Sequence, residues 1–188
     1  GLYRRWETLK DMRGQELNRL ESERCQAVRD SIASSISYFD EQITAVEAAL
    51  DVLVEQTPNL QHLFDLLISI PGVGKVTAYL LLAELDFQVF SSAQEVVAFA
   101  GLNPRHNASG KFQGRVTLSK QGSARLRKEL YFPAISAQRY NPLIRPLCLR
   151  LENEGKCPLF IICAAMRKLL HLAFGVVKTN SPFDSHYL

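Results

Sequence analysis

The first 55 residues contain no proline, and their only glycines are Gly1 and Gly14, so this stretch can form long helices. From residue 32 onward the apolar side chains advance in alternating steps of four and three residues, the a/d spacing of a coiled coil. The seam consists of Ile32, Ile36, Phe39, Ile43, Val46, Leu50 and Leu53. A weaker stripe precedes it at Leu2, Trp6, Leu9, Leu17 and Leu20. We expect two helices, or one long bent helix, that pair with each other or with another copy. An amphipathic helix that packs on its own domain is the alternative.

Thr57-Pro58-Asn59 ends this arm, because proline cannot continue a helix and disfavours helical geometry in the preceding residue. The sequence thus predicts two domains, a coiled-coil helical arm over 1–57 and a compact helical domain over 58–188. Helices are expected at 60–69, 75–85, 93–100, 123–139 and 159–178, with Ser91 or Ser92 capping the third. Between them, 101–122 contains four glycines and is expected to form a long loop or a short hairpin around 114–118. The predicted fold class is therefore mainly all-α.

Basic charge gathers in one segment, although the net charge of the chain is only +3. Between Glu95 and Glu129 no residue is acidic, and the basic ones are Arg105, Lys111, Arg115, Lys120, Arg125, Arg127 and Lys128. This asymmetry favours a polyanionic partner over a merely solvated face. The four loop residues can reach phosphates, and Arg125 and Lys128 share a helix face that extends the patch. Arg127 should face elsewhere and pair with an acidic side chain such as Glu84.

A glycine-rich turn, Ile70-Pro71-Gly72-Val73-Gly74-Lys75, lies between two predicted helices and resembles a helix-hairpin-helix motif. Two glycines allow a tight turn, and the following helix begins with unpaired backbone N–H groups and the positive end of its dipole. These features suit a phosphate oxygen. The predicted phosphate-binding residues are Pro71, Gly72, Val73, Gly74 and Lys75, and a turn that serves packing alone is the alternative.

The cysteine pattern and the most apolar segment both favour a cytoplasmic protein. None of the four cysteines forms a Cys-x-x-Cys pair, so we expect reduced thiols and no metal site. The apolar stretch 158–177 is interrupted by Arg167, Lys168 and His171. We therefore expect it to be a buried core helix and not a membrane span.

Several short motifs keep one order along residues 66–183. They are Ile70-Pro71-Gly72-Val73-Gly74, Phe99-Ala100-Gly101-Leu102, Pro104-Arg105, Ser109-Gly110, Ser119-Lys120, Leu126-Arg127, Met166-Arg167-Lys168-Leu169 and Pro182-Phe183-Asp184. In this order they resemble the C-terminal transposase domain of the IS110/IS116/IS902 family, in the branch that includes bridge-RNA-guided recombinases.

The resemblance implies a role for Ser109 as the nucleophile that attacks a DNA phosphodiester and becomes a phosphoserine. From the residues alone, Thr117, Ser119 and Ser123 are equally good candidates, and Ser109 could simply be a loop or phosphate-binding serine. In the family, an N-terminal RuvC-like domain supplies an acidic cluster and Mg²⁺. These 188 residues hold no counterpart of that domain, so we expect them to need no cofactor and to bind DNA without cutting it alone.

The same resemblance implies double-stranded DNA, a structured guide RNA and further copies of the chain as partners, with a dimer or tetramer formed through the coiled coil. The expected location is the bacterial cytoplasm, with no membrane partner. Two other functions remain open. One is a non-catalytic helix-hairpin-helix scaffold that binds nucleic acid, and the other is a coiled-coil assembly domain whose basic loop is incidental.

Overall fold

The computed structural model describes residues 1–105, 108–109, 112–113, 117–119 and 121–186, without the side chains at 105, 108–109, 112–113 and 117. The described residues form nine helices and four two-residue strands, which confirms the mainly all-α class. The chain divides into two compact units, Gly1–Gln61 and His62–Leu188, and each is described by itself.

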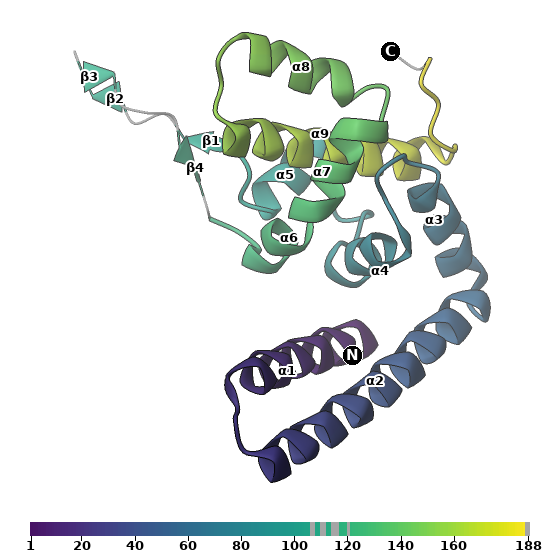
Figure 1. The fold of residues 1–188 in the computed structure, drawn as a ribbon. Helices are drawn as coiled ribbons and strands as arrows, with labels where there is room; N and C mark the ends of the chain where they lie inside the picture. Colours follow the sequence, from purple (N-terminus) through teal and green to yellow (C-terminus); the bar gives the residue numbers. More distant parts are fainter. Residues whose placement is uncertain (106–107, 110–111, 114–116, 120, 187–188) are drawn as a thin grey trace. The chain divides into compact units, whose positions relative to one another are not determined.

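The first unit is a hairpin of two helices, α1 (Leu2–Ser22) and α2 (Gln26–Glu55), which run antiparallel (Figure 1). The indole Nε1 of Trp6 donates to Oε1 of Glu47 at 2.8 Å. Nearer the loop, Arg13 of α1 forms an ion pair with Asp40 of α2. The two helices thus pair with each other, which is one of the two arrangements that the seam allowed.

The loop between these helices is held by charged side chains that bind its backbone. The Glu23 carboxylate accepts the N–H groups of Arg24 and Cys25, both at 2.8 Å. These bonds, that from Cys25 first, lower the pKa of Glu23 below its ordinary value. Arg29 closes the loop from the other side, because its guanidinium donates to the carbonyls of Leu20 and Glu23, both at 2.9 Å.

The buried positions of α2 depart from the predicted seam at its end. Ile32, Leu50 and Val54 are buried, whereas Leu53 is 46% exposed. A heptad pattern keeps one face only if the helix supercoils to 3.5 residues per turn, and a straight helix has 3.6. Over six turns the buried face therefore moves by about one residue. Leu53 was the wrong member of the seam, and Val54 takes its place.

The second unit is built around α9 (Pro158–Thr179), which packs against α5 (Ala93–Phe99), α7 (Tyr131–Tyr140) and α8 (Arg145–Asn153). By length and composition alone, α9 could cross a membrane. In this fold Leu169, Leu170 and Ala173 are fully buried. The helix is therefore the core helix that its charged interruptions predicted.

Two helix boundaries differ from those predicted. The stretch expected as one helix over 123–139 is α6 (Ala124–Glu129) and then α7, with Leu130 between them. Pro133 explains the break, because it has no N–H to bond the carbonyl of Glu129 four residues earlier. The sequence also predicted no helix between Asn141 and the helix at 159–178, yet α8 begins at Arg145. Pro146 lies in its first turn, where a missing N–H costs nothing.

Candidate nucleic-acid interface

The turn between α3 (Pro58–Ile68) and α4 (Lys75–Glu84) has the geometry that its glycine requires. The Val73 N–H donates to the Ile70 carbonyl at 2.9 Å, which closes a four-residue turn. Gly72, its third residue, has φ +104°. Such a φ belongs to the type II turn with proline second and glycine third. The predicted glycine turn between two helices is therefore present.

This turn lies directly on α7. A Cβ at Gly72 would come within 2.6 Å of the Ala137 Cβ, so the two backbones approach more closely than side chains allow. Beside them Asn141 is fully buried. Its Nδ2 donates to the Pro71 carbonyl at 2.9 Å, and its Oδ1 accepts the N–H groups of Leu143 and Ile144. Asn141 thus fixes the turn to the start of the α7–α8 connection.

The start of α4 is open to solvent, since Gly74, Lys75 and Val76 are all exposed. Gly74 is the N-cap and has no side chain to cap the helix. The first-turn N–H groups have no carbonyl partner within the helix, and together with the dipole they favour an anion. Behind them the rings of Phe64 and Tyr79, 5.0 Å apart between centroids, join α3 to α4.

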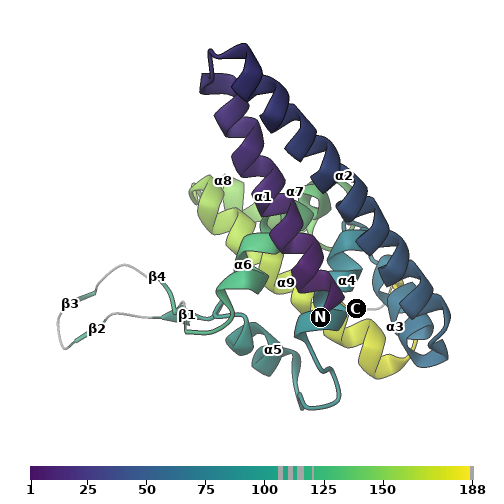
Figure 2. The ribbon, with the colours of Figure 1, turned by 90° about the horizontal axis from the view of Figure 1, so that it is seen from below.

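The basic segment forms an antiparallel ribbon. Strand β1 (Pro104–Arg105) pairs with β4 (Thr117–Leu118), and β2 (Ala108–Ser109) pairs with β3 (Phe112–Gln113). Figures 1 and 2 both show this ribbon projecting away from the helices. The chain reverses between Ser109 and Phe112, which face each other in the register. The predicted hairpin around 114–118 was therefore placed too late along the chain.

The base of the ribbon is closed by backbone contacts between α5 and α6. The Ser123 N–H donates to the Phe99 carbonyl at 2.8 Å, and the Ser119 N–H to the Asn103 carbonyl at 2.9 Å. Gly122 has φ +147°, and a Cβ there would lie 2.2 Å from the Phe99 oxygen. Only glycine fits between the two strands of chain at this point.

Two arginines of α6 have structural partners. The Arg127 guanidinium donates to the carbonyls of Ala100 and Gly122, at 3.0 and 3.2 Å. Glu84 pairs instead with Arg125, at 3.1 Å. The expected Arg127–Glu84 pair was wrong. Helix α6 packs on α4 through the side that carries Arg125. Arg127 lies about 200° further around the helix and therefore points toward the base of the ribbon.

The residues predicted to bind nucleic acid thus lie in two separate sites, and each site is held by different helices. Pro71 to Lys75 lie together in the turn on α7, whereas the ribbon leaves the unit between α5 and α6. Lys128 is exposed on α6 and forms an ion pair with Glu129 at 3.5 Å. The backbones of Arg105 and Ser109 lie in β1 and β2. Lys111, Arg115 and Lys120 are outside the described residues.

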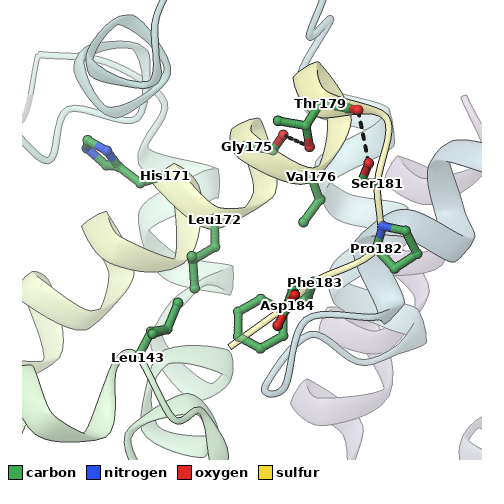
Figure 3. Close-up of a pocket in the computed structure, with 10 residues that line it drawn as sticks. All are labelled: Leu143, His171, Leu172, Gly175, Val176, Thr179, Ser181, Pro182, Phe183 and Asp184. Atoms are coloured by element: carbon green, nitrogen blue, oxygen red, sulfur yellow. Dashed lines mark hydrogen bonds between the residues drawn. The ribbon is translucent and has the colours of Figure 1, made fainter. Parts of the chain in front are cut away.

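A small pocket near the C-terminus has no counterpart in the sequence predictions. Its volume is about 170 Å³, and Figure 3 shows Leu143, Leu172 and Phe183 around it, with His171 at one margin. The Phe183 N–H donates to the Ser69 hydroxyl at 2.8 Å, which ties the C-terminal segment to the end of α3. Burial, and after it the charges of Arg167 and Lys168, lower the pKa of His171.

Comparison with known proteins places both candidate sites in one matched segment. Residues 64–148 match the transposase family described as IS116/IS110/IS902. The chain belongs to this family. The matched segment contains the turn, the ribbon and Asn141, so these three features lie in the part that matches the IS116/IS110/IS902 transposase domain.

Individual relatives agree with this assignment. The pilin gene-inverting protein of Moraxella bovis is 37% identical over 161 residues, which are 84% of this chain and 50% of the relative. The pilin gene-inverting protein of Moraxella lacunata is 35% identical over the same shares. The uncharacterized 43.6 kDa protein of insertion element IS110 from Streptomyces coelicolor is 28% identical over 82% of this chain and 38% of that protein. The chain therefore spans about half the length, or less, of these curated relatives.

Proposed function

We propose that this chain is the DNA-binding C-terminal part of an IS110-type transposase or recombinase, and that Ser109 is its nucleophile in strand cleavage and exchange. The observation that carries the proposal is the position of Ser109 in the ribbon. Its backbone pairs with Phe112 where the chain reverses, within the segment that matches the family. A serine at the outer end of a ribbon whose base is fixed can enter a DNA groove while the helical unit stays outside.

The proposed chemistry conserves the number of phosphodiester bonds. The Ser109 oxygen bonds to phosphorus, the bond from phosphorus to one sugar oxygen breaks, and that oxygen takes a proton as serine loses its own. A sugar hydroxyl of another strand then attacks the phosphoserine, which joins the strands and frees the serine. No external energy source is needed, because each step exchanges one phosphate ester for another.

Activation of the serine requires a base or a metal ion. Among the residues that the structure describes, no three His, Cys, Asp or Glu side chains form a group that could hold a metal. No step is therefore assigned to a metal ion held by the described residues. We propose that a domain outside these 188 residues supplies the activating group.

Binding of DNA would use both candidate sites, the turn before α4 and the ribbon. The start of α4 offers backbone N–H groups to a phosphate, and the basic side chains near the ribbon offer charge. Contacts of this kind position the protein without reading base sequence. A structured guide RNA and further copies of the chain complete the proposed set of partners. The arm would pair with a copy through its exposed apolar side chains, among them those of Val28, Val52 and Leu53.

The deciding experiment uses a protein of the length of the curated relatives and radiolabelled recombination-site DNA. A covalent protein–DNA adduct that survives denaturing electrophoresis is expected, and Ser109→Ala should abolish it. Ser119→Ala is the matched control and should keep the adduct. An adduct formed by Ser109→Ala would refute the nucleophile assignment. Salt-dependent DNA binding with no adduct from any variant would instead favour the non-catalytic scaffold.

A further inference from the structure

A second basic surface lies where α7 ends and α8 begins, away from the ribbon. It is a cavity of about 510 Å³, within the range of about 300–1,000 Å³ usual for ligand sites. Its lining residues are Ile135, Ser136, Gln138, Arg139, Tyr140 and Arg145. None of these lining residues is acidic, so the cavity has a positive charge that favours an anionic occupant.

Three of the lining side chains carry N–H groups without acceptors. The Nε2 of Gln138 is buried and has no hydrogen-bond partner among the described residues. Arg139 and Arg145 are exposed, and the guanidinium of neither forms a hydrogen bond or ion pair with any residue that the structure describes. An unsatisfied buried donor destabilises a fold by about 1–3 kcal/mol, so an acceptor from a ligand would be favourable here. Guanidinium groups match phosphate oxygens particularly well.

Exposed aromatic rings lie on α7 as well, and that of Tyr140 lines the cavity. Tyr140 is 66% exposed, and Phe132 on the same helix is 75% exposed. Phe132, Ile135 and Arg139 follow helical spacing along one strip of α7. The opposite strip, with Ala134, Ala137 and Asn141, is fully buried. The outer face of α7 therefore combines flat apolar rings with cations.

We propose that the outer face of α7 and the first turn of α8 bind a single-stranded stretch of nucleic acid. The Tyr140 ring stacks on a base, while Arg139 and Arg145 bind the phosphates on either side. Rings beside cations are the surface that single strands use, because every unpaired base exposes an aromatic face. A duplex hides these faces, and an acidic peptide would account for the cations but not for the rings. The proposal goes beyond the role of Ser109 and does not depend on it.

The test measures affinity of the 188-residue chain for fluorescent single-stranded DNA, single-stranded RNA of the same sequence, and the DNA duplex. Tyr140→Ala should weaken binding of a single strand about tenfold, and Tyr140→Phe, which keeps the stacking ring, should bind within about twofold of wild type. Replacing Arg139 and Arg145 together by Gln should reduce the slope of log affinity against log salt by about 1.4. Duplex affinity should not respond to the tyrosine.

Matched controls come from the arm. Tyr38→Ala removes an exposed tyrosine and Arg24→Gln an exposed arginine, and both should bind single strands as the wild type does. A higher affinity for the single-stranded RNA than for the single-stranded DNA would identify RNA as the bound nucleic acid. Wild-type affinity in Tyr140→Ala, or an equal loss for duplex and single strand, would overturn the proposal.

Discussion

Gly72 and Gly14 differ in their surroundings, because Gly72 lies in the turn between α3 and α4 and Gly14 lies within α1. Gly72 has φ +104° and its backbone meets Ala137, whereas a Cβ at Gly14 would find nothing within 4 Å. Gly72→Ala should lower the free energy of unfolding by about 2–3 kcal/mol, through both strain and overlap. Gly14→Ala should raise it by about 0.5–1 kcal/mol, because alanine favours α1. Urea denaturation followed by circular dichroism measures both changes, and equal effects would contradict the turn geometry.

His171 predicts how stability depends on pH. Burial lowers its pKa in the folded state, with Arg167 and Lys168 adding to the effect, while an unfolded histidine titrates near 6.5. Between the lowered value and about 6.5 the unfolded chain therefore holds more protons, so stability falls as the pH drops through this window.

The measurement is the free energy of unfolding at pH 7.5 and 5.5. His171→Gln should lose less stability over this interval than the wild type does. His186→Gln, which replaces an exposed histidine, is the control and should behave like the wild type. An unchanged pH dependence in His171→Gln would show that other groups cause the loss.

The roles of single arginines show where prediction from sequence ends. Spacing along α6 correctly placed Arg125 and Arg127 on different faces. Which of them meets Glu84 depends on how α6 packs against α4, and the spacing within one helix does not contain this information. The glycines of the ribbon base are a similar case, since the partner of Gly122 is the Phe99 carbonyl, brought close only by the fold.

At the scale of elements, the arm offers a direct test of its seam. Leu50 is 7% exposed and Leu53 is 46% exposed, although the heptad pattern predicted both as buried. Leu50→Ala should destabilise the arm by about 2–4 kcal/mol, and Leu53→Ala by less than about 1 kcal/mol. Trp6 is the only tryptophan and bonds Glu47 across the hairpin, so its fluorescence in urea reports this unit. Equal losses of stability in the two variants would show that both leucines belong to the buried seam, as the heptad pattern predicted.

Prolines and strands explain the other differences between prediction and structure. Pro133 and Pro146 both look like helix breaks in the sequence, yet Pro133 divides a helix and Pro146 lies in the first turn of one. Position within a helix decides the effect, and it is known only when the ends are known. The helices predicted from apolar periodicity were found, since that pattern is local. The register of the ribbon depends on pairing between residues that are distant in the sequence, so only the approximate position of the ribbon could be predicted.

For the whole molecule, composition and periodicity were sufficient for the all-α class, and motif order was sufficient for the family. They left open which basic side chains would bind DNA together under the proposed function. If about six phosphates are neutralised, log affinity for duplex DNA should fall against log salt with a slope near −5. Lys75→Gln should make this slope shallower by about 0.9 if Lys75 binds a phosphate. Arg125→Gln should leave the slope unchanged and reduce stability, because Arg125 pairs with Glu84.

Asn141 reaches back to Pro71 across 70 residues of sequence, and Phe183 reaches back to Ser69 across 114. A ribosome releases the earlier member of each pair long before the later one. During synthesis, the turn at Pro71 and the end of α3 therefore lack their hydrogen-bond partners, Asn141 and Phe183, until those residues have been made. A growing chain cannot hold this turn in its final shape until α7 has emerged, and the bond from Phe183 to the end of α3 forms later still. The unit can thus complete its structure only after Phe183 has emerged from the ribosome.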